Sequence, residues 1–505
     1  MRAKFGSTGL VLVLVLVTLL SVSLPLWAAE IIILHTNDVH SRLESHVPQG
    51  LQLEQGGRVR LATLVERVRE QYGANKVLLL DAGDSIHGTN IDNLFGGFPS
   101  IEVMGAMGYN AFTPGNHEFN FGQEVLTQRT LDAKFPTLAA NVTFADGTLF
   151  AGYSALVQEI NGVKVGIIGL VAQETPIVTH PKNVEGLTFH EPIAIAKQVA
   201  KALRPEVDVL VALSHLGYSK DVELAEAVPE LDVIVGGHSH TKLAAAQEVN
   251  GVIIVQTHEY ANYLGFLRLQ VEDKKIVAHE SRLLPVTANV AKHAEVQAIV
   301  DYWNEQVQQR LSLVVGKSDI SWDGERASVR TQETNLGNLV ADIIRATVGS
   351  DIALTNGGGI RASIKPGEIR VADIYTTLPF DNTLVVVEML GMDIIEVLEH
   401  SVRLVPEQNG GFLQVSGITF EVDPNALPGG RVINVRVNGN KISTGAYYTV
   451  ATNDFLAAGG DGYEVFKNAT LVADTGIMLR DVMVDYFEEH PAVEAPEEGR
   501  IVILK

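Results

Sequence analysis

The stretch EIIILHTNDVH (residues 30–40) joins a run of apolar residues to two side chains that bind metal ions. Residues 31–34 are all aliphatic, the pattern of a strand buried on both faces. Asp38 and His40 follow, two residues apart. In an α/β sheet, ligand sites form where the loops at the carboxyl ends of strands converge. The stretch therefore predicts a core strand that presents an oxygen and a nitrogen ligand at a sheet edge.

Four later runs repeat this arrangement of a buried strand followed by metal-ligand side chains. They are KVLLLDAGDS (76–85), MGYNAFTPGNHE (107–118), VDVLVALSHLG (207–217) and LDVIVGGHSH (231–240). Their ligand-type residues are Asp84, Asn116, His117, His215, His238 and His240. Oxygen and imidazole ligands suit two divalent ions held roughly 3.5–4 Å apart, as in phosphate-ester hydrolases. The pattern predicts a two-metal hydrolase in which Asp84 bridges the ions.

The composition limits the class of protein and the chemistry of its sites. The chain has 505 residues, so we expect two or three domains. It contains no cysteine, which excludes disulfides and thiolate metal sites. The net charge of −22 argues against a nucleic-acid polymer as a partner. A small anionic substrate is compatible with this charge, because bound cations and a few arginines reverse the potential locally.

Residues 1–29 have the pattern of a secretory signal peptide. Two basic residues precede an apolar stretch (10–26), and the small residues Ala28 and Ala29 end the segment. Because the stretch is short for a membrane span, a cleaved signal is favoured over an uncleaved anchor. We expect a periplasmic or secreted protein with no stable membrane association after cleavage.

The order of predicted elements divides the rest of the chain into two α/β domains. Residues 30–290 alternate strand and helix patterns, and Asn161-Gly162 marks a hairpin that makes part of the sheet antiparallel. Residues 291–317 are interpreted as a linker helix and hinge. Residues 318–505 have their own strand and helix patterns. In that part, ITFEVDP, RVINVRVNGN and YYTVAT predict a meander with a turn at Asn438-Gly439.

The strand-end motifs resemble those of a known family. Asp-x-His, Gly-Asp, Gly-Asn-His-Glu, a single His and Gly-His-x-His, in this order, resemble the calcineurin-like metallophosphoesterases. The resemblance extends to the secreted 5′-nucleotidase family, which includes bacterial periplasmic UDP-sugar hydrolases and vertebrate ecto-5′-nucleotidases. It implies an N-terminal sandwich of mixed β-sheets flanked by helices, and a second, nucleotide-binding α/β domain. The motifs of that second domain are NGGGIRASI (356–364), LPFDNTL (378–384), GFLQVSGI (411–418) and FLAAGGDGY (455–463).

By this resemblance, seven residues hold two divalent metal ions, which are Zn, Mn, Co or Mg. A water or hydroxide on the metals attacks the phosphorus in line with the leaving oxygen. His117 is implied to stabilise the transition state or to protonate the leaving group. One ion is held by Asp38, His40, Asp84 and His240, and the other by Asp84, Asn116, His215 and His238.

The motif around His117 departs from that of many relatives, which have an aspartate three residues later. This chain has Asn120 there, in NHEFNFG, and an amide orients the imidazole without adding a charge. We therefore expect a weaker general acid or a different orienting carboxylate. In relatives that act on 2′,3′-cyclic nucleotides, the corresponding motif resembles NHEFN. A 2′,3′-cyclic-nucleotide phosphodiesterase with 3′-nucleotidase activity is therefore an open alternative.

The resemblance also implies a set of substrate-binding residues. Phe380 and Phe455 stack on the two faces of the base, and Asp461 binds the ribose. Arg42 contacts the phosphate. Further contacts to the base edge, ribose or phosphates come from Arg330, Asn356 and Arg361, and the pocket is lined by Gly357–Gly359, Asn382 and Gly417.

Together these features predict an exported 5′-nucleotidase that releases phosphate from nucleoside 5′-monophosphates, with UDP-sugars as a further substrate class. A sulfur-compound hydrolase of the same superfamily is disfavoured, because it needs no stacking phenylalanines. A non-catalytic exported nucleotide-binding protein is disfavoured as well, because no metal ligand is lost. The remaining histidines, including His87 and His258, are expected to be structural or exposed.

Overall fold

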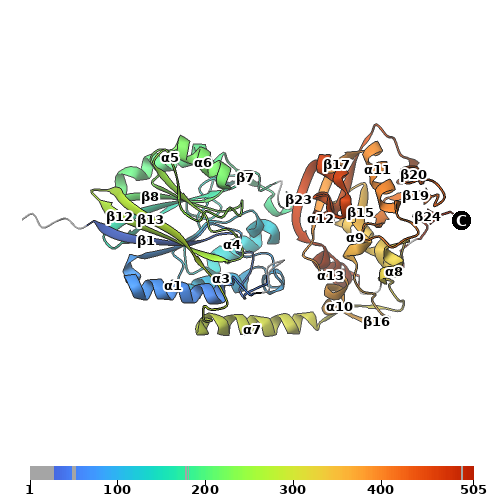
Figure 1. Ribbon diagram of the computed structural model, residues 1–505, viewed down its shortest axis with the longest axis horizontal. Coiled ribbons are helices and arrows are strands. Elements are labelled where there is room, and N and C mark those ends of the chain that lie inside the picture. The colour runs from blue at the N-terminus through green and yellow to red at the C-terminus, as the bar shows by residue number, and fades with distance from the viewer. Residues whose placement is uncertain are drawn as a thin grey trace, which may run out of the picture.

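The computed structural model describes residues 28–47, 53–176, 179, 181–490, 493–496 and 498–504. It shows two α/β units joined by a long helix (Figure 1). Almost all of the predicted signal peptide lies outside the described residues. Within the part of the chain that is described, no helix is both long enough and apolar enough to cross a membrane.

The first unit is a sandwich of two mixed β-sheets. Its central strands pair in parallel, whereas β12–β13 and β5–β6 are antiparallel hairpins. This confirms the predicted sandwich. One sheet has the order β13 (Lys275–Pro285), β12 (Tyr263–Glu272), β1 (Ala29–Thr36), β2 (Val77–Asp81), β3 (Ala111–Phe112). The other has the order β10 (Gln247–Val249), β11 (Val252–Val255), β9 (Val233–Gly236), β8 (Val209–His215), β6 (Val163–Val171), β5 (Ala155–Ile160).

Strand β1 shows why the sequence packs as a sandwich. Its side chains alternate between the two faces of the sheet. Ile31 and Ile33 belong to the core between the sheets, whereas Ile32 and Leu34 belong to the core under the helices. All four are fully buried, which the uninterrupted aliphatic run predicts.

Helices cover the outer face of each sheet (Figure 1). The hairpin at Asn161-Gly162 is confirmed, and both residues have positive φ, 51° and 82°. A small ribbon pairs β4 (Val142–Phe144) with β7 (Leu187–Phe189). The helices on the first sheet are α1 (Arg58–Tyr72), α2 (Asn90–Asn93), α3 (Phe98–Met107) and α4 (Gln123–Asp132), and those on the second are α5 (Pro192–Leu203) and α6 (Tyr218–Ala227).

Helix α7 (Ala294–Leu311) connects the two units. Its residues Val296, Val300 and Val307 belong to the core of the first unit. The Trp303 ring lies 4.8 Å from that of Phe95. The helix therefore packs on the first unit, and the chain enters the second unit at β14 (Val314–Ser318).

The second unit is built around a five-stranded sheet. One face is covered by α9 (Asn335–Val348), α10 (Val371–Thr377) and α13 (Leu479–Glu489), and the other by α11 (Gly391–Val402) and a smaller sheet. Short helices α8 (Arg326–Val329) and α12 (Asp454–Ala457) and strand β16 (Gly367–Arg370), paired with β14, complete it. The main sheet has the order β18 (Leu413–Ser416), β15 (Ile352–Asn356), β22 (Tyr447–Asn453), β17 (Thr383–Leu390), β23 (Thr470–Met478). The smaller has the order β21 (Asn440–Lys441), β20 (Val432–Val437), β19 (Ile418–Val422), β24 (Ile501–Ile503).

The predicted meander is confirmed in part. Strands β19, β20 and β21 form it, with the turn at Asn438-Gly439. The prediction is wrong for YYTVAT, because β22 lies in the main sheet between β15 and β17. Val450 and Ala451 in that strand are fully buried, and a strand buried on both faces belongs at the centre of a sheet.

Candidate functional site

The strand-end residues of the first unit converge at one edge of the sandwich. Loops after β1, β2 and β3 of one sheet meet loops after β8 and β9 of the other. Within each ligand group, the nitrogen and oxygen atoms lie within 4.8 Å of one another. The groups are Asp38–His40–His240, His40–Asp84–His117 and Asp84–His215–His238.

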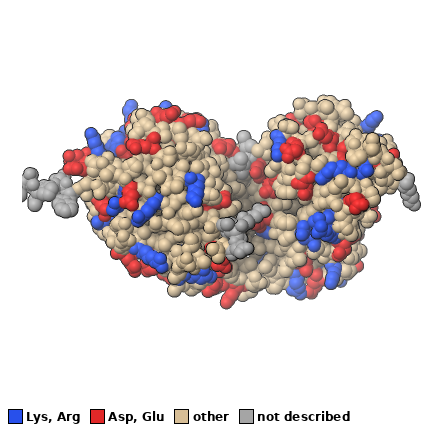
Figure 2. Space-filling model, in the orientation of Figure 1, with Lys and Arg blue, Asp and Glu red and all other residues tan. Residues whose placement is uncertain are grey.

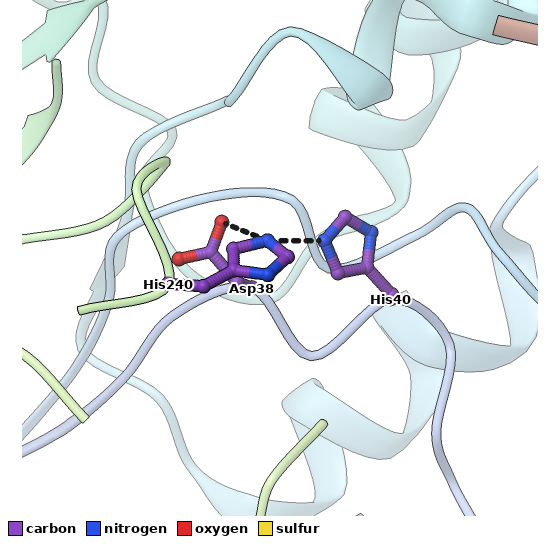
Figure 3. Close-up of side chains that lie close together, drawn as sticks. All are labelled: Asp38, His40 and His240. Carbon is purple, nitrogen blue, oxygen red and sulfur yellow. Dashed lines mark hydrogen bonds and ion pairs between the residues drawn. The ribbon is translucent and has the colours of Figure 1, made fainter. Parts of the chain in front are cut away.

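Figure 3 shows the first of these groups. The Nε2 atom of His240 lies 3.4 Å from a carboxylate oxygen of Asp38 and 3.1 Å from Nε2 of His40. Residues 200 positions apart in the chain thus point their ligand atoms at one another. Asp84 belongs to both of the other groups, which places it at the centre of the cluster.

Five of these residues have a left-handed backbone. The φ angles are positive at Asp38 (51°), His40 (48°), Asp84 (55°), His238 (72°) and His240 (50°). Residues other than glycine rarely adopt this backbone region. Those that do are strained and cluster at functional sites. These residues lie in the loops that follow β1, β2 and β9.

Neighbouring groups fix the orientation of two imidazoles. His215 Nδ1 lies 2.6 Å from the carbonyl oxygen of Ala82, and His240 Nδ1 is hydrogen-bonded to the carboxylate of Glu259. In both rings Nε2 is left to face the cluster. This is how metal-binding histidines are usually held, with the second ring nitrogen on a carbonyl or carboxylate.

Glu118 connects the loops after β2 and β3 through hydrogen bonds. Its carboxylate accepts hydrogen bonds from the backbone N–H groups of Asp84, at 2.8 Å, Ser85, at 2.6 Å, and Gly115. The carboxylate is fully buried, and burial together with the charge of Asp84 raises the pKa of Glu118 to about 7. The loop after β2 is thereby held in register with the loop after β3.

Burial and mutual charge set the protonation of the ligands. Burial lowers the pKa of His40 to about 4, so its neutral ring offers a lone pair. Burial opposes a charge on His215 too, but the adjacent Asp84 carboxylate raises the pKa of His215 to about 10. Against the effect of burial, His215 and His117 hold the pKa of Asp84 well below its usual range. A divalent cation at this place replaces such protons.

The donor set fits divalent metal ions. The Oδ1 atom of Asn116 is buried and has no hydrogen-bond partner among the described residues, and the Nε2 atom of His215 faces the Asp84 carboxylate at 3.1 Å. Leaving buried polar atoms without a partner is costly, and so such atoms indicate a missing ligand. Two carboxylates, an amide oxygen and imidazoles are hard and borderline donors that suit Zn, Mn, Co or Mg.

Asn120 contacts His117 directly. His117 begins the short helix η2 (His117–Phe121), and its Nδ1 lies 2.8 Å from the amide nitrogen of Asn120. The amide oxygen of Asn120 accepts a hydrogen bond of 2.9 Å from the Thr179 hydroxyl. Among the described residues, no carboxylate is hydrogen-bonded to the His117 ring. The His117 imidazole is therefore oriented by the amide of Asn120 and not by a carboxylate elsewhere in the described residues.

The second unit contains a cavity of about 270 Å³ that collects seven of the nine predicted substrate-binding residues. Phe380 and Phe455 are 46% and 44% exposed, as stacking surfaces for a planar ligand must be. The amide of Asn356 donates to a carboxylate oxygen of Asp461 at 2.9 Å. The seven residues are Arg330, Asn356, Arg361, Phe380, Asn382, Phe455 and Asp461, with Gly358 and Gly359 beside them.

Arg42 lies in a second cavity, of about 460 Å³, which both units line. Its guanidinium lies 5.1 Å from the ring centre of Tyr260 on the first unit. Pro379, Asp381 and Arg480 line the opposite side. Arg42 thus stands between the metal ligands and the segment that carries Phe380.

The structure does not bring Gly417 into the substrate cavity. It lies between β18 and β19, in a separate cavity lined by Arg345 and Arg436. Its φ is +73°, and a Cβ atom there would be 2.1 Å from the carbonyl oxygen of Asp351. The glycine permits a tight turn, and the structure does not place it with the other predicted substrate-binding residues.

Comparison with known proteins identifies the family. The calcineurin-like phosphoesterase model matches residues 31–242, and the 5′-nucleotidase C-terminal domain model matches residues 314–468. The 5′-nucleotidase of Homo sapiens is 31% identical over 542 residues, with 96% of this chain and 93% of that protein covered. This chain belongs to the 5′-nucleotidase family.

Solved structures of the 5′-nucleotidase family share the fold. The 5′-nucleotidase precursor of Thermus thermophilus is 34% identical, with a TM-score of 0.58 over 94% of this chain and 99% of that one. The NAD nucleotidase of Haemophilus influenzae is 26% identical, with a TM-score of 0.79 over the same shares. A further relative, compared by sequence, is the trifunctional nucleotide phosphoesterase of Bacillus subtilis, which is 32% identical. The alignment covers 94% of this chain and 35% of that protein.

Membership of the 5′-nucleotidase family makes this chain a metal-dependent phosphoesterase that uses divalent ions. Three residues beside its ligand cluster were not predicted. Glu118 follows His117 directly, and its place in the Gly-Asn-His-Glu motif was the available signal. Glu259 and His87 give no signal in the sequence, because their partners lie 19 and 33 residues away.

Proposed function

We propose that this protein is an exported nucleotidase that hydrolyses nucleoside 5′-monophosphates. One observation carries the proposal: the chain combines a cluster of metal-ligand side chains in the first unit with a cavity walled by two half-exposed phenylalanines in the second. Relatives named 5′-nucleotidase, which align over more than nine-tenths of the chain, support it. An aromatic clamp accepts any base, because every base has a π-face.

The roles of the residues follow from their positions. The seven predicted ligands would hold two divalent ions, which would supply Lewis acidity and activate a water. Asp84, shared by two ligand groups, is the proposed bridge between them. Arg42, in the cavity that both units line, neutralises charge on the phosphate. His117 donates a hydrogen bond to a phosphoryl or leaving-group oxygen.

A second candidate is a 2′,3′-cyclic-nucleotide phosphodiesterase with 3′-nucleotidase activity. The observation that favours it is the amide of Asn120, which contacts the His117 ring where many relatives have a carboxylate. Without a carboxylate to stabilise the imidazolium, His117 is less suited to protonate a poor leaving group. Hydrolysis of UDP-sugars is a further activity of the same site, because the clamp does not select the base.

The test uses the mature chain, residues 30–505, with Mn²⁺, Zn²⁺, Co²⁺ or Mg²⁺. Phosphate release is measured from AMP, UDP-glucose, 2′,3′-cyclic AMP and 3′-AMP. We expect AMP hydrolysis that EDTA abolishes and a divalent ion restores. Hydrolysis that persists in EDTA contradicts the metal mechanism. Activity confined to the cyclic compound and 3′-AMP favours the second candidate.

The substrate cavity is tested by Phe380→Ala and Phe455→Ala. Each is expected to raise KM for AMP about tenfold, because stacking on a base is worth roughly 1–3 kcal/mol. Hydrolysis of 4-nitrophenyl phosphate, which has no base, should be unchanged. The matched control is Tyr447→Ala, which removes an exposed aromatic ring outside the cavity. Equal effects on both substrates would contradict the stacking role.

A further inference from the structure

A buried histidine outside the metal-ligand set lies directly behind His117. His87 is on the loop after β2, three residues beyond Asp84, and is 5% exposed. Its ring is parallel to that of His117, with an interplanar angle of 5° and centroids 5.5 Å apart. The sequence alone predicts a structural or exposed histidine at position 87, yet His87 lies against the imidazole to which the proposed function assigns a role in catalysis.

The amide of Asn120 links the two rings. Its nitrogen lies 2.8 Å from Nδ1 of His117 and 3.3 Å from Nδ1 of His87. The amide oxygen accepts from the Thr179 hydroxyl, which leaves the nitrogen facing the rings. An amide nitrogen has two hydrogens and only donates. One amide therefore satisfies both rings, and in each ring Nδ1 is the acceptor.

This arrangement selects one tautomer of His117. A neutral imidazole that accepts at Nδ1 carries its proton on Nε2. The His117 ring lies edge-on to that of His40, 5.1 Å away, and so the opposite side of the ring from Asn120 is near the ligand cluster. The Nε2–H group is then available as a donor to an oxygen bound there.

Packing prevents the amide and both rings from rotating freely. The ring of Phe121 contacts His87 edge-on at 5.3 Å. Gly476 of β23, in the second unit, lies so close to Asn120 that a Cβ atom would be 2.2 Å from the amide nitrogen. Removal of His87 would leave one amide hydrogen without its acceptor and one face of His117 without its neighbour.

We propose that His87 is a positioning residue, which together with Asn120 holds the His117 ring in one orientation and in the tautomer with the proton on Nε2. The inference rests on the proposed function for the catalytic role of His117. A carboxylate at this position accepts from Nδ1–H, whereas the amide donates to Nδ1, so the shared amide orients the ring but leaves its proton on Nε2.

The test compares two variants of the mature, metal-loaded chain. His87→Phe keeps a flat ring against His117 but removes the acceptor. His87→Asn removes the stacked ring but places an acceptor oxygen near the position of Nδ1. We expect kcat for AMP to fall about fivefold in His87→Phe, the effect of one hydrogen bond, with KM unchanged. His87→Asn should recover most of kcat. The control is His190→Phe, which replaces a histidine outside the ligand groups and removes its hydrogen bond to Thr143. It shows what the same substitution does without contact to His117.

A second readout does not depend on turnover. Long-range ¹H–¹⁵N spectra of the Mg²⁺-loaded chain, labelled on histidine, report which ring nitrogen carries the proton. We expect His117 to show an unprotonated Nδ1 in the wild type and in His87→Asn, and a mixture of tautomers in His87→Phe.

The outcomes separate the two proposals. Wild-type kcat and an unchanged His117 spectrum in His87→Phe would overturn the positioning role. Equal loss of kcat in both variants, with a lowered melting temperature, would assign His87 a structural role only and would also overturn it. A wild type that releases no phosphate from AMP would contradict the proposed function, and the spectra would still decide the hydrogen-bond network.

Discussion

The histidines of the candidate metal site are held through their second ring nitrogen. Ala82 holds His215 and Glu259 holds His240, in each case at Nδ1. The Nε2 atom of each ring is then directed at the cluster before any ion arrives, and a bound cation replaces its proton. Such preorganisation raises metal affinity, because the ring loses little freedom on binding.

Glu259→Gln should weaken metal binding. The amide provides no negative charge to His240 Nδ1, and loss of such a partner typically costs about 10–100-fold in metal affinity. The measurement is titration of the metal-free protein by calorimetry. Glu226→Gln, an exposed glutamate on α6, is the matched control. Unchanged affinity would mean that His240 is not a ligand or needs no partner.

Asn120→Asp should move the acidic limb of the pH–rate profile to higher pH by about one unit. A carboxylate in contact with Nδ1 favours the protonated ring, which the amide of Asn120 does not. Asn183→Asp, whose side chain contacts the backbone carbonyl of Asn120, controls for added charge near the site. An unchanged profile would show that residue 120 does not orient His117.

At the scale of secondary-structure elements, helix α6 carries a buried carboxyl group under the second sheet. Asp221 accepts a hydrogen bond from Ser214 of β8, but its buried Oδ2 atom has no hydrogen-bond partner in the described part of the chain. Burial raises the pKa of Asp221 from 3.8 to about 8. The folded protein therefore keeps this carboxyl group protonated at neutral pH.

A prediction about stability follows from Asp221. The folded state holds a proton that the unfolded state has lost between pH 3.8 and about 8. The stabilising contribution of Asp221 is therefore full below pH 3.8 and falls as pH rises toward 8. Asp221→Asn should be more stabilising, relative to the wild type, at about pH 8 than at about pH 5. Urea unfolding of the metal-free proteins measures this, and a difference independent of pH would contradict it.

At the scale of the whole molecule, the metal ligands and the aromatic cavity lie on different units. A notch separates the units at the upper edge of Figure 2, where acidic and basic side chains are interspersed. Arg42 lines the cavity between them. A nucleotide stacked on Phe380 and Phe455 must bring its phosphate to the ligand cluster, so we expect the units to move during turnover.

Fluorescence energy transfer tests this movement. The chain has no cysteine, so Leu131→Cys and Leu427→Cys, both highly exposed and on different units, accept a donor and an acceptor dye cleanly. A phosphonate analogue of AMP with Mg²⁺ should change the transfer efficiency. The analogue should have no effect at the same concentration when Phe380 and Phe455 are alanine. Turnover with unchanged efficiency in the wild type would contradict closure.

Much of the site was predictable from single strands. An aliphatic run and the ligand after it are neighbours in the chain, so Asp38, Asp84 and His215 reach the sheet edge by local geometry. The positions of β22 and Gly417 were not predictable in this way. β22 pairs with β15 and β17, which are distant from it in the chain, so no local pattern determines its place in the sheet.

The sequence by itself determined the strand-end ligands, the order of motifs and the family to which they belong, because these signals are carried by residues close together in the chain. Only the tertiary structure decided how the ligands are held and what surrounds His117. Glu259, His87 and Thr179 act through hydrogen bonds to residues 19 to 59 positions away. A hydrogen bond requires contact within about 3 Å, and loop convergence, rather than spacing along the chain, determines which side chains meet.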